Sequence, residues 1–418
     1  MASSDWYLIL SVIGAGFTLV ALRPPRRPQF LMGITFFAAW LTTELAAWFL
    51  VFQVLITLGF VAAGALAEWT GWLGLAITLA SWVGLGYIVH SARRTAQVFA
   101  AAFDEGLGPG WGDAFDPTWA PSTQRFEWRR VVLPFSFRRA GVERRRGLDY
   151  VGDGAKRHRL DIYKRADAGP GAPVLLQIHG GAWVVGAKEQ QGLPLMYHLA
   201  ARGWICVAIN YRLSPKATWP AQLLDCQAAL TWVRANIAQH GGDPNYVVVT
   251  GGSAGGHLTA LTALTDGHVR AMVPFYGIYD WTNRFNQRGR NDGMRKMLAR
   301  LVIKQPFDAA RDVYEDASPM NHITDSAPPA LVIHGTLDTL APVAEAREFV
   351  RMLRAVSHKP VVYAELPGAH HAFEVFQSIR TMHTVAAVDL FLTWLLTHDP
   401  PRAVAELAAD QSSERLGR

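Results

Sequence analysis

Long apolar runs that few charges interrupt make up the first 95 residues of the chain. One run covers residues 6–22, a second covers residues 30–66 and a third covers residues 72–90. A helix of about 20 apolar residues is long enough to cross the hydrocarbon core of a bilayer, which is about 30 Å thick. The pattern therefore predicts a helical transmembrane domain over residues 1–95.

The second run is too long for a single span, because a helix of its 37 residues would measure about 55 Å. We expect residues 46–66 to form the span, with residues 30–45 at the interface or packed against protein. A fourth span hidden in this run is the alternative. Glu44 lies inside the run, where an ionisable side chain serves either a function or hydrogen bonding between helices. The three expected spans are residues 6–22, 46–66 and 72–90.

The distribution of positive charge orients these spans. No Lys or Arg lies in the 65 residues between Arg27 and Arg93, and the turn near Glu68 carries no positive charge. Positive residues favour the cytoplasmic ends of spans. Three spans place the chain after residue 95 in the cytoplasm, together with both basic clusters: Arg23, Arg26 and Arg27, and Arg93 and Arg94. A buried helical domain of a soluble protein is the alternative, but a water-facing surface rarely lacks cations over such a length.

After residue 140 the pattern changes to short β-branched runs that alternate with helical patterns. This alternation predicts a mostly parallel sheet with helices on both faces. The expected strands cover residues 144–150, 159–163, 174–178, 205–209, 246–250, 271–275, 330–333 and 361–364. The expected helices cover residues 220–237, 256–264, 344–353 and 381–396.

The same patterns divide the chain into segments. The transmembrane domain is followed by a linker that is also a candidate N-terminal cap, by an α/β domain that carries a cap insertion, and by a polar tail. In that order the segments are residues 1–95, 96–140, 141–398 with the insertion at 281–329, and 399–418.

Composition narrows the class of protein further. Only 18% of the 418 residues are charged and half are hydrophobic, whereas a soluble enzyme carries about 25% charge, so part of the chain is expected in lipid. The net charge of +6 is too modest to predict nucleic-acid binding. Cys206 and Cys226 lack the spacing of a metal site or a redox pair, so we expect buried free thiols and neither a metal nor a cofactor.

The clearest chemical motif is Gly-Gly-Ser-Ala-Gly-Gly at residues 251–256. It lies between an expected strand and an expected helix, which is the setting of a nucleophile elbow. The turn is so tight that glycines are needed beside the serine, and the N-terminus of the helix favours a developing negative charge. Ser253 is therefore the candidate nucleophile.

A second motif, His-Gly-Gly-Ala-Trp at residues 179–183, follows an expected strand. In acyl transfer the attacked carbonyl oxygen becomes an oxyanion that N–H donors stabilise, and glycines let the backbone approach closely. The candidate donors are the amides of Gly180, Gly181 and Ala254. His179 and Trp183 are candidate substrate-binding residues; His179 is also expected to hold the loop, and packing is the alternative for Trp183.

A serine nucleophile needs a base, and the base needs an acid that orients it. In an α/β-hydrolase the chain order is serine, acid, histidine. Asp338 follows the expected strand at residues 330–333, and His370 and His371 follow the last expected strand. The rival acids lie in a loop-like region: Asp312, Asp316 and Asp325.

Together these motifs resemble the hormone-sensitive-lipase branch of the α/β-hydrolase esterases. The similarity covers about residues 142–396 and also includes Leu-Asp-Ile-Tyr at 160–163, Asn-Tyr-Arg-Leu-Ser-Pro at 210–215, Gly-Asp-Pro at 242–244, Gly-Thr-Leu-Asp at 335–338 and His-Ala-Phe at 371–373. It implies Ser253 as nucleophile, Asp338 as acid and His371, rather than His370, as base. The family usually has Asp where this chain has Gly252, and often a third Gly where it has Ala182.

The resemblance implies an α/β-hydrolase fold with a mostly parallel, eight-stranded sheet. It also implies a carboxylesterase or lipase that cleaves an apolar or lipid ester through an acyl-enzyme on Ser253. With the apolar runs, the sequence predicts an integral protein of the cytoplasmic membrane with a cytoplasmic catalytic domain. Its expected partners are the ester substrate and membrane lipids, and the oligomeric state stays open. An amidase or thioesterase with the same triad and a non-catalytic ligand-binding membrane protein are the alternatives.

A basic amphipathic helix is expected within the cap insertion. One side carries Arg and Lys, and the apolar side is formed by Met294, Met297, Leu298, Leu301 and Val302. Such a helix either lies on an anionic membrane surface or packs as a cap on its own domain.

Overall fold

The computed structural model describes residues 2–25, 32–113, 115, 126–289 and 292–401. Two of the predicted basic residues, Arg26 and Arg27, lie outside the described residues, as does the predicted polar tail beyond residue 401.

One eight-stranded sheet forms the centre of the described part of the chain, with strand order β1-β2-β4-β3-β5-β6-β7-β8. The first two pairings are antiparallel and all later ones are parallel. This confirms the predicted mostly parallel sheet. The strands are β1 (Val142–Asp149), β2 (Arg159–Arg165), β3 (Ala172–Ile178), β4 (Ile205–Ile209), β5 (Gly242–Gly252), β6 (Ala271–Phe275), β7 (Ala330–Gly335) and β8 (Val361–Leu366).

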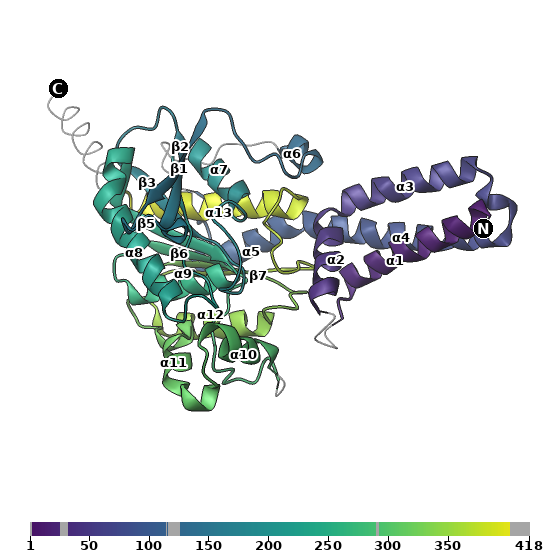
Figure 1. The fold of residues 1–418 in the computed structure, drawn as a ribbon. Coiled ribbons are helices and arrows are strands. Elements are labelled where there is room, and N and C mark those ends of the chain that lie inside the picture. The colour runs from purple at the N-terminus through teal and green to yellow at the C-terminus, as the bar shows by residue number, and fades with distance from the viewer. Residues whose placement is uncertain (1, 26–31, 114, 116–125, 290–291, 402–418) are drawn as a thin grey trace, which may run out of the picture.

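Helices precede the sheet and connect its strands (Figure 1). They are α1 (Ser3–Leu22), α2 (Met32–Glu44), α3 (Ala46–Ala62), α4 (Trp69–Arg93), α5 (Thr95–Leu107), α6 (Trp128–Val132), α7 (Leu193–Ala201), α8 (Ala221–Asn236), α9 (Ala254–Thr265), α10 (Gly293–Met297), α11 (Arg311–Asp316), α12 (Val343–Val356) and α13 (Ile379–His398). Short single turns are η2 (Ala65–Ala67), η3 (Lys156–His158), η4 (Ile237–His240), η5 (Leu298–Val302), η6 (Phe307–Ala309) and η7 (Pro319–Asn321).

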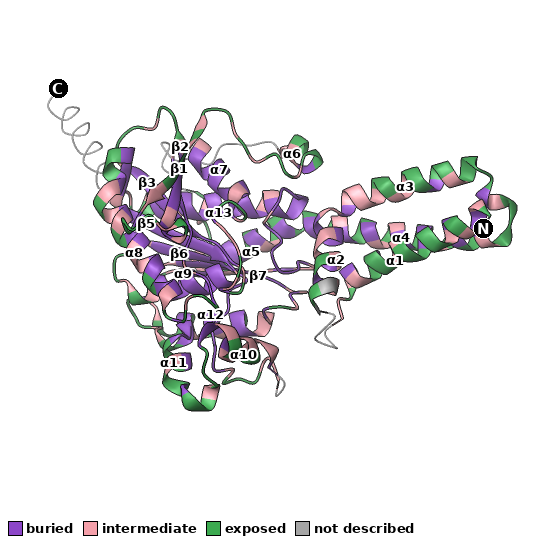
Figure 2. Ribbon diagram, in the orientation of Figure 1, coloured by how far each residue is buried: buried purple, intermediate pink, exposed green. Residues whose placement is uncertain are grey.

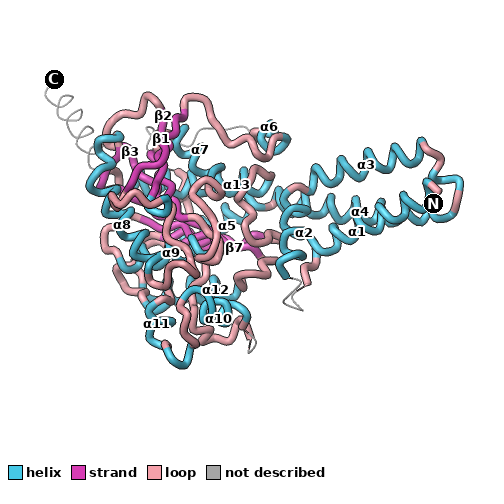
Figure 3. Tube along the Cα trace, viewed as in Figure 1, coloured by secondary structure: helices cyan, strands magenta, loops and turns pink. Residues whose placement is uncertain are grey.

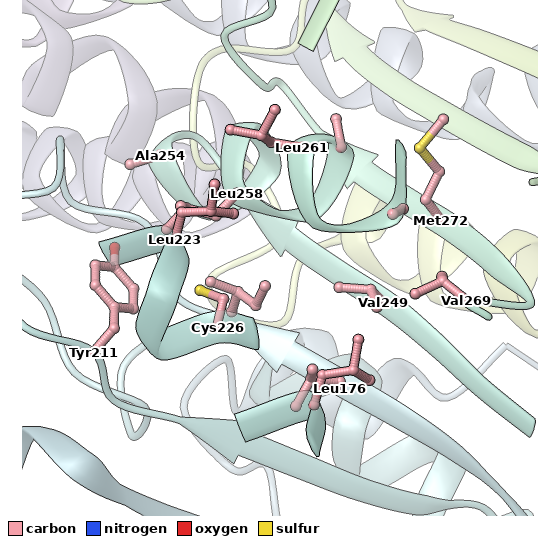
Figure 4. Packing of buried hydrophobic residues seen from close by; sticks show 14 of the residues in the cluster. Leu176, Tyr211, Leu223, Cys226, Val249, Ala254, Leu258, Leu261, Val269 and Met272 are labelled. Atoms are coloured by element: carbon pink, nitrogen blue, oxygen red, sulfur yellow. The ribbon is translucent and has the colours of Figure 1, made fainter. Parts of the chain in front are cut away.

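Two apolar layers enclose the sheet. Side chains of β3 alternate between them, with Leu176 in the layer under α8, α9 and α12, and Leu175 in the layer under α5, α7 and α13. Figure 4 shows the first layer, where Cys226 of α8 lies among apolar side chains of the strands. Cys206 lies in the second layer, and both cysteines are buried and free, as predicted. We call the sheet with these helices the α/β unit.

Helices α1, α3 and α4 form a helical arm that projects from the α/β unit, and every strand of the described residues lies in the latter (Figures 1 and 3). Many residues of the arm are exposed (Figure 2), and large apolar side chains such as Trp69 and Val83 are among them. Its inside holds hydroxyl groups as well as apolar side chains such as Leu85, and Thr78 donates to Ser11 there at 2.9 Å. The arm therefore buries polar groups and exposes apolar ones, the reverse of the α/β unit.

Three helical segments of the described chain are long and apolar enough to cross a membrane: Ser3–Leu22, Trp69–Leu107 and Ile379–His398. The last of these is α13. In its most apolar stretch 72% of the residues are buried, so α13 is a core helix of the α/β unit. The second predicted run is divided at Leu45, because α2 and α3 meet there at 88°. Helix α2 therefore turns away from the arm and lies at its base (Figure 1).

Two segments outside the sheet, the predicted linker and the expected amphipathic helix, pack against the α/β unit. The predicted linker begins with α5, whose Phe99 and Phe103 are buried in the sheet's second layer. The expected amphipathic helix is α10 and the turn after it, and Leu298 and Val302 are both fully buried at 0% exposure. Its apolar side packs on its own domain, which is the arrangement expected of a cap helix, and its role as a cap stays a prediction.

Candidate active site

Ser253 stands between the end of β5 and the start of α9, as the elbow motif predicts. Its backbone has φ 60° and ψ −122°, and its N–H donates to the Phe275 carbonyl at 3.0 Å. A non-glycine residue with positive φ is uncommon, and such strained backbone gathers at functional sites. The turn presents a half-buried serine at the carboxyl end of the sheet.

Asp338 and His371 come together behind the ends of β7 and β8. His371 Nδ1 donates to Asp338 Oδ2 at 2.6 Å, while Oδ1 accepts the amides of Leu340 and Ala341 at 2.8 Å each. Burial alone would raise the pKa of Asp338, but the charge of His371 and hydrogen bonds from His334 and His371 hold it well below its usual range. Asp338 is thus an ionised acceptor that fixes the imidazole of His371.

Tyr276 joins this pair to the elbow. Its ring centre lies 4.5 Å from that of His371, and its hydroxyl oxygen lies 2.5 Å from the position that a Cβ on Gly252 would take. The tyrosine therefore lies against His371 and against Gly252, the residue that precedes Ser253. Within the described part of the chain, neither Ser253 Oγ nor His371 Nε2 makes a hydrogen bond.

His370 has a different environment from its neighbour. Its Nε2 lies 2.8 Å from the carbonyl oxygen of Ala21 in α1, and burial lowers its pKa to about 4. No hydrogen bond in the described chain joins it to Asp338, or joins His371 to any of the rival acids at positions 312, 316 and 325.

The predicted oxyanion loop lies against the elbow, where a Cβ on Gly180 would come within 3.1 Å of Ser253 Cβ. The amide of Gly180 already donates to Gln191 Oε1 at 2.5 Å. The amides of Gly181 and Ala254 make no hydrogen bond among the described residues, so two of the three candidate donors are unpaired. Sequence reasoning missed Gln191, for which no motif stands out.

Backbone strain continues through this loop. Gly181 has φ 114°, and a Cβ there would lie 2.1 Å from the Val185 carbonyl oxygen. Ala182 and Trp183 also have positive φ, at 52° and 61°. The conformation at Ala182 explains why glycine often stands at this position in the family.

His179 and Trp183 support the loop from below, each with 1% exposure. His179 Nδ1 donates to the Gly180 carbonyl at 2.7 Å and its ring stacks on Tyr211. Trp183 Nε1 donates to His257 Nδ1 at 3.2 Å. These contacts show a packing role for both, and their substrate contacts stay a prediction.

Tyr276 and Glu374 form a buried pair beside His371 that sequence reasoning missed. The tyrosine hydroxyl donates to the Glu374 carboxylate, and burial raises the pKa of Glu374 to about 6. A side chain at position 252 would collide with this hydroxyl. The structure thus explains why this chain has Gly252 where the family usually has Asp. This glycine was the only sign of the Tyr276–Glu374 pair in the sequence.

Comparison with known proteins extends this picture. A profile of the BD-FAE family matches residues 160–353. The "Probable carboxylic ester hydrolase LipM" of Mycobacterium tuberculosis is 40% identical over 416 residues, an alignment that covers 92% of this chain and 92% of that protein. The chain belongs to the α/β-hydrolase esterase family. It is an enzyme that hydrolyses carboxylic esters.

Other esterases resemble this one over shorter stretches. Esterase LipQ of Mycobacterium tuberculosis is 38% identical and matches 72% of this esterase and 75% of its own chain. A solved esterase of Thermogutta terrifontis, Est2, superposes with a TM-score of 0.51 at 23% identity, covering 66% of this esterase and 98% of its own chain. The solved esterase of Pyrobaculum calidifontis superposes with a TM-score of 0.51 at 23% identity, covering 67% of this esterase and 99% of its own chain. These solved structures share the fold and leave about a third of this esterase unmatched.

The likeness to LipM reaches further along this esterase than the likeness to the solved structures. The 8% of the chain that it leaves uncovered is shorter than the 95-residue N-terminal segment. Similarity therefore extends into the N-terminal helices, which the family profile does not include.

Proposed function

We propose that this esterase is a membrane-anchored serine hydrolase that cleaves an ester of an apolar acyl group through an acyl-enzyme on Ser253. The observation that carries the proposal is the His371–Asp338 hydrogen bond of 2.6 Å beside a strained serine elbow. A serine at a strand-to-helix turn, a histidine that keeps Nε2 unpaired and an ionised acid behind it are the parts of a nucleophile, base and orienting acid.

Each group has one task in the reaction. His371 Nε2 takes the hydroxyl proton as Ser253 Oγ attacks the ester carbonyl, and Asp338 stabilises the imidazolium. The unpaired amides of Gly181 and Ala254 donate to the oxyanion. The C–O bond to the alcohol breaks as His371 returns the proton to the leaving oxygen. Water then attacks the acyl-serine with the same histidine as base, which releases the acid and restores the serine.

The inverted burial of the arm supports the anchoring. In lipid, apolar side chains face outward and hydroxyl groups hydrogen-bond between helices. The arm has this arrangement, with Thr18 and Ser81 joined at 2.8 Å inside it. We propose that α1, α3 and α4 cross the bilayer, whereas α2, with 13 residues, is about 20 Å long and too short to do so.

The charges at the two ends of the arm support a cytoplasmic α/β unit. Arg23 follows α1 and Arg93 is the last residue of α4, both at the end where these helices meet the α/β unit. The far end carries Glu68, which accepts from Ser4 at 3.0 Å. Positive charge favours the cytoplasmic side, so the α/β unit belongs there.

Four measurements test the proposal. A fluorophosphonate probe should label wild-type protein in membranes and leave Ser253→Ala unlabelled, and hydrolysis of activated esters of graded acyl length should fall by about 10⁴-fold or more in that variant. Full activity of Ser253→Ala would refute the serine mechanism. Release of the protein by alkaline carbonate would refute the anchor, and digestion of a C-terminal tag from outside spheroplasts would refute the orientation.

A further inference from the structure

The loop at residues 367–373, which carries His371, touches three of the N-terminal helices. We call it the His371 loop. From α4, Ser91 Oγ donates to the Pro367 carbonyl at 3.0 Å. From α2, Trp40 Nε1 donates to the Ala372 carbonyl at 2.8 Å. His370 reaches the Ala21 carbonyl of α1, so the loop is held at its start, middle and end.

A buried ion pair holds the same helices against the loop. Glu44 at the end of α2 pairs with Arg380 near the start of α13, and Ser378 donates to Glu44 at 2.7 Å. Arg380 Nη2 also donates to the Pro367 carbonyl at 3.2 Å. Both charged side chains are buried, and a pair without water around it tolerates little displacement.

The loop needs such contacts, because part of it is strained. Ala372, directly after His371, has φ 61°, a left-handed conformation that a side chain disfavours. Its carbonyl is the group that Trp40 binds. A strained backbone persists where the surroundings over-determine it, so the indole N–H stabilises the conformation that aims His371.

The imidazole itself also meets an N-terminal helix. Phe36 of α2 approaches the His371 ring edge-on, with ring centres 6.1 Å apart, while Tyr276 lies at 4.5 Å. Phe36 in turn stacks on Trp40. One ring of the α/β unit and one of α2 therefore confine the histidine.

We propose that the N-terminal helices position the base of this esterase, in addition to any anchoring role: Trp40, Ser91 and Ala21 hold the His371 loop in its reactive conformation. This rests on the proposed role of His371. Trp40 and Ser91 are positioning residues, since their contacts are to the loop backbone and not to Ser253 or His371 side-chain nitrogens. Helices α4 and α5 form one continuous 39-residue segment, so the arm is joined firmly to the unit it adjusts.

The competing explanation is that these bonds merely attach the α/β unit to the arm. A matched control separates the two. Trp48 Nε1 of α3 donates to the Val131 carbonyl of α6 at 3.4 Å, which is the same kind of bond across the same junction but away from the His371 loop. An attachment role predicts equal effects of removing either indole N–H.

The experiment compares Trp40→Phe with Trp48→Phe in full-length protein in lipid nanodiscs. With a short p-nitrophenyl ester, Trp40→Phe should lower kcat roughly ten- to a hundredfold with little change in KM, because a displacement of about 1 Å at a reacting group costs on the order of a hundredfold. Fluorophosphonate labelling should slow in parallel. Trp48→Phe should stay within about twofold of wild type. Equal kcat values in the two variants would overturn the proposal.

A second pair covers the case in which Trp40→Phe does not fold. Ser91→Ala should lower kcat and Ser91→Thr, which keeps the hydroxyl, should restore it, with similar melting temperatures for both. Equal kcat values for these two would also overturn positioning. The His371→Ala variant separates failure of this proposal from failure of the proposed function. If His371→Ala is active, His371 is not the base and the proposed function fails. If His371→Ala is inactive while Ser91→Ala keeps full activity, His371 is still supported as the base and only the positioning proposal fails.

Discussion

The helical arm and the α/β unit bury opposite kinds of side chain. In the α/β unit, apolar side chains of the strands and of the covering helices form two buried layers. In the arm, Ser and Thr hydroxyls face one another and Leu, Val and Trp face outward. The hydrophobic effect explains the first arrangement, since water is the alternative environment. The second arrangement is the one expected of helices in lipid, which supports the proposed anchor.

The two regions meet at the His371 loop, and the largest expected effect lies there. His371→Ala should reduce kcat/KM of ester hydrolysis by about 10⁴-fold or more, because members of a triad act as a unit. His370→Ala should cost about tenfold or less, since this histidine contacts Ala21 of the arm and not Asp338. Steady-state kinetics of both purified variants check this. An inactive His370→Ala beside an active His371→Ala would reassign the base.

A charge placed on each outer surface tests the comparison directly. Leu55 of α3 and Leu224 of α8 are exposed helical leucines, at 59% and 52%. Leu55→Asp should cost about 2.5–3.5 kcal/mol of membrane insertion, the scale for Asp in a spanning helix. Leu224→Asp should change stability by about 0.5 kcal/mol or less, as for other water-facing positions.

The fraction of each leucine variant that alkaline carbonate extracts from membranes measures the difference. Leu55→Asp should become partly extractable or be degraded, and Leu224→Asp should remain as wild type. If both variants stay in the membrane and melt alike, the outside of the arm faces water or protein, and the inverted pattern needs another cause.

Local patterns in the sequence were enough to predict most of the α/β unit. β4 and β6 match the expected ranges residue for residue, because buried parallel strands are continuous apolar runs between turns. The elbow and the loop after β8 were also visible, since each couples a motif to a strand end. The catalytic roles assigned to Ser253, Asp338 and His371 stay predictions that the geometry supports.

The remaining parts of the site depend on contacts between distant segments. Trp40 and Ala372 are 332 residues apart, and no local pattern says that α2 bends away at Leu45 to meet them. Glu44 therefore looked like an isolated acid in an apolar run, although it pairs with Arg380. The sequence around Tyr276 did not predict its contact with His371 either. That contact depends on the space that Gly252 leaves free for the tyrosine ring.

The smallest expected effect is a pH dependence of stability that arises in the α/β unit and not in the arm. Burial raises the pKa of Glu374 from its usual 4.5 to about 6, so the folded α/β unit binds this proton more tightly than the unfolded chain does. The stability that follows is present below about pH 4.5 and is lost as the pH rises through about 6. Glu374→Gln should remove this dependence while still accepting a hydrogen bond from Tyr276.

Relative to wild type, the unfolding free energy of Glu374→Gln should therefore rise by about 2 kcal/mol between about pH 3.5 and pH 7.5, the equivalent of about 1.5 pKa units. Thermal melts at a series of pH values measure it. Ser81→Ala in the arm is the control, because it removes a buried hydroxyl that does not titrate, and its effect should be the same at every pH. A constant difference for Glu374→Gln as well would mean that the carboxyl keeps its ordinary pKa in the folded protein, so that water reaches it beside His371.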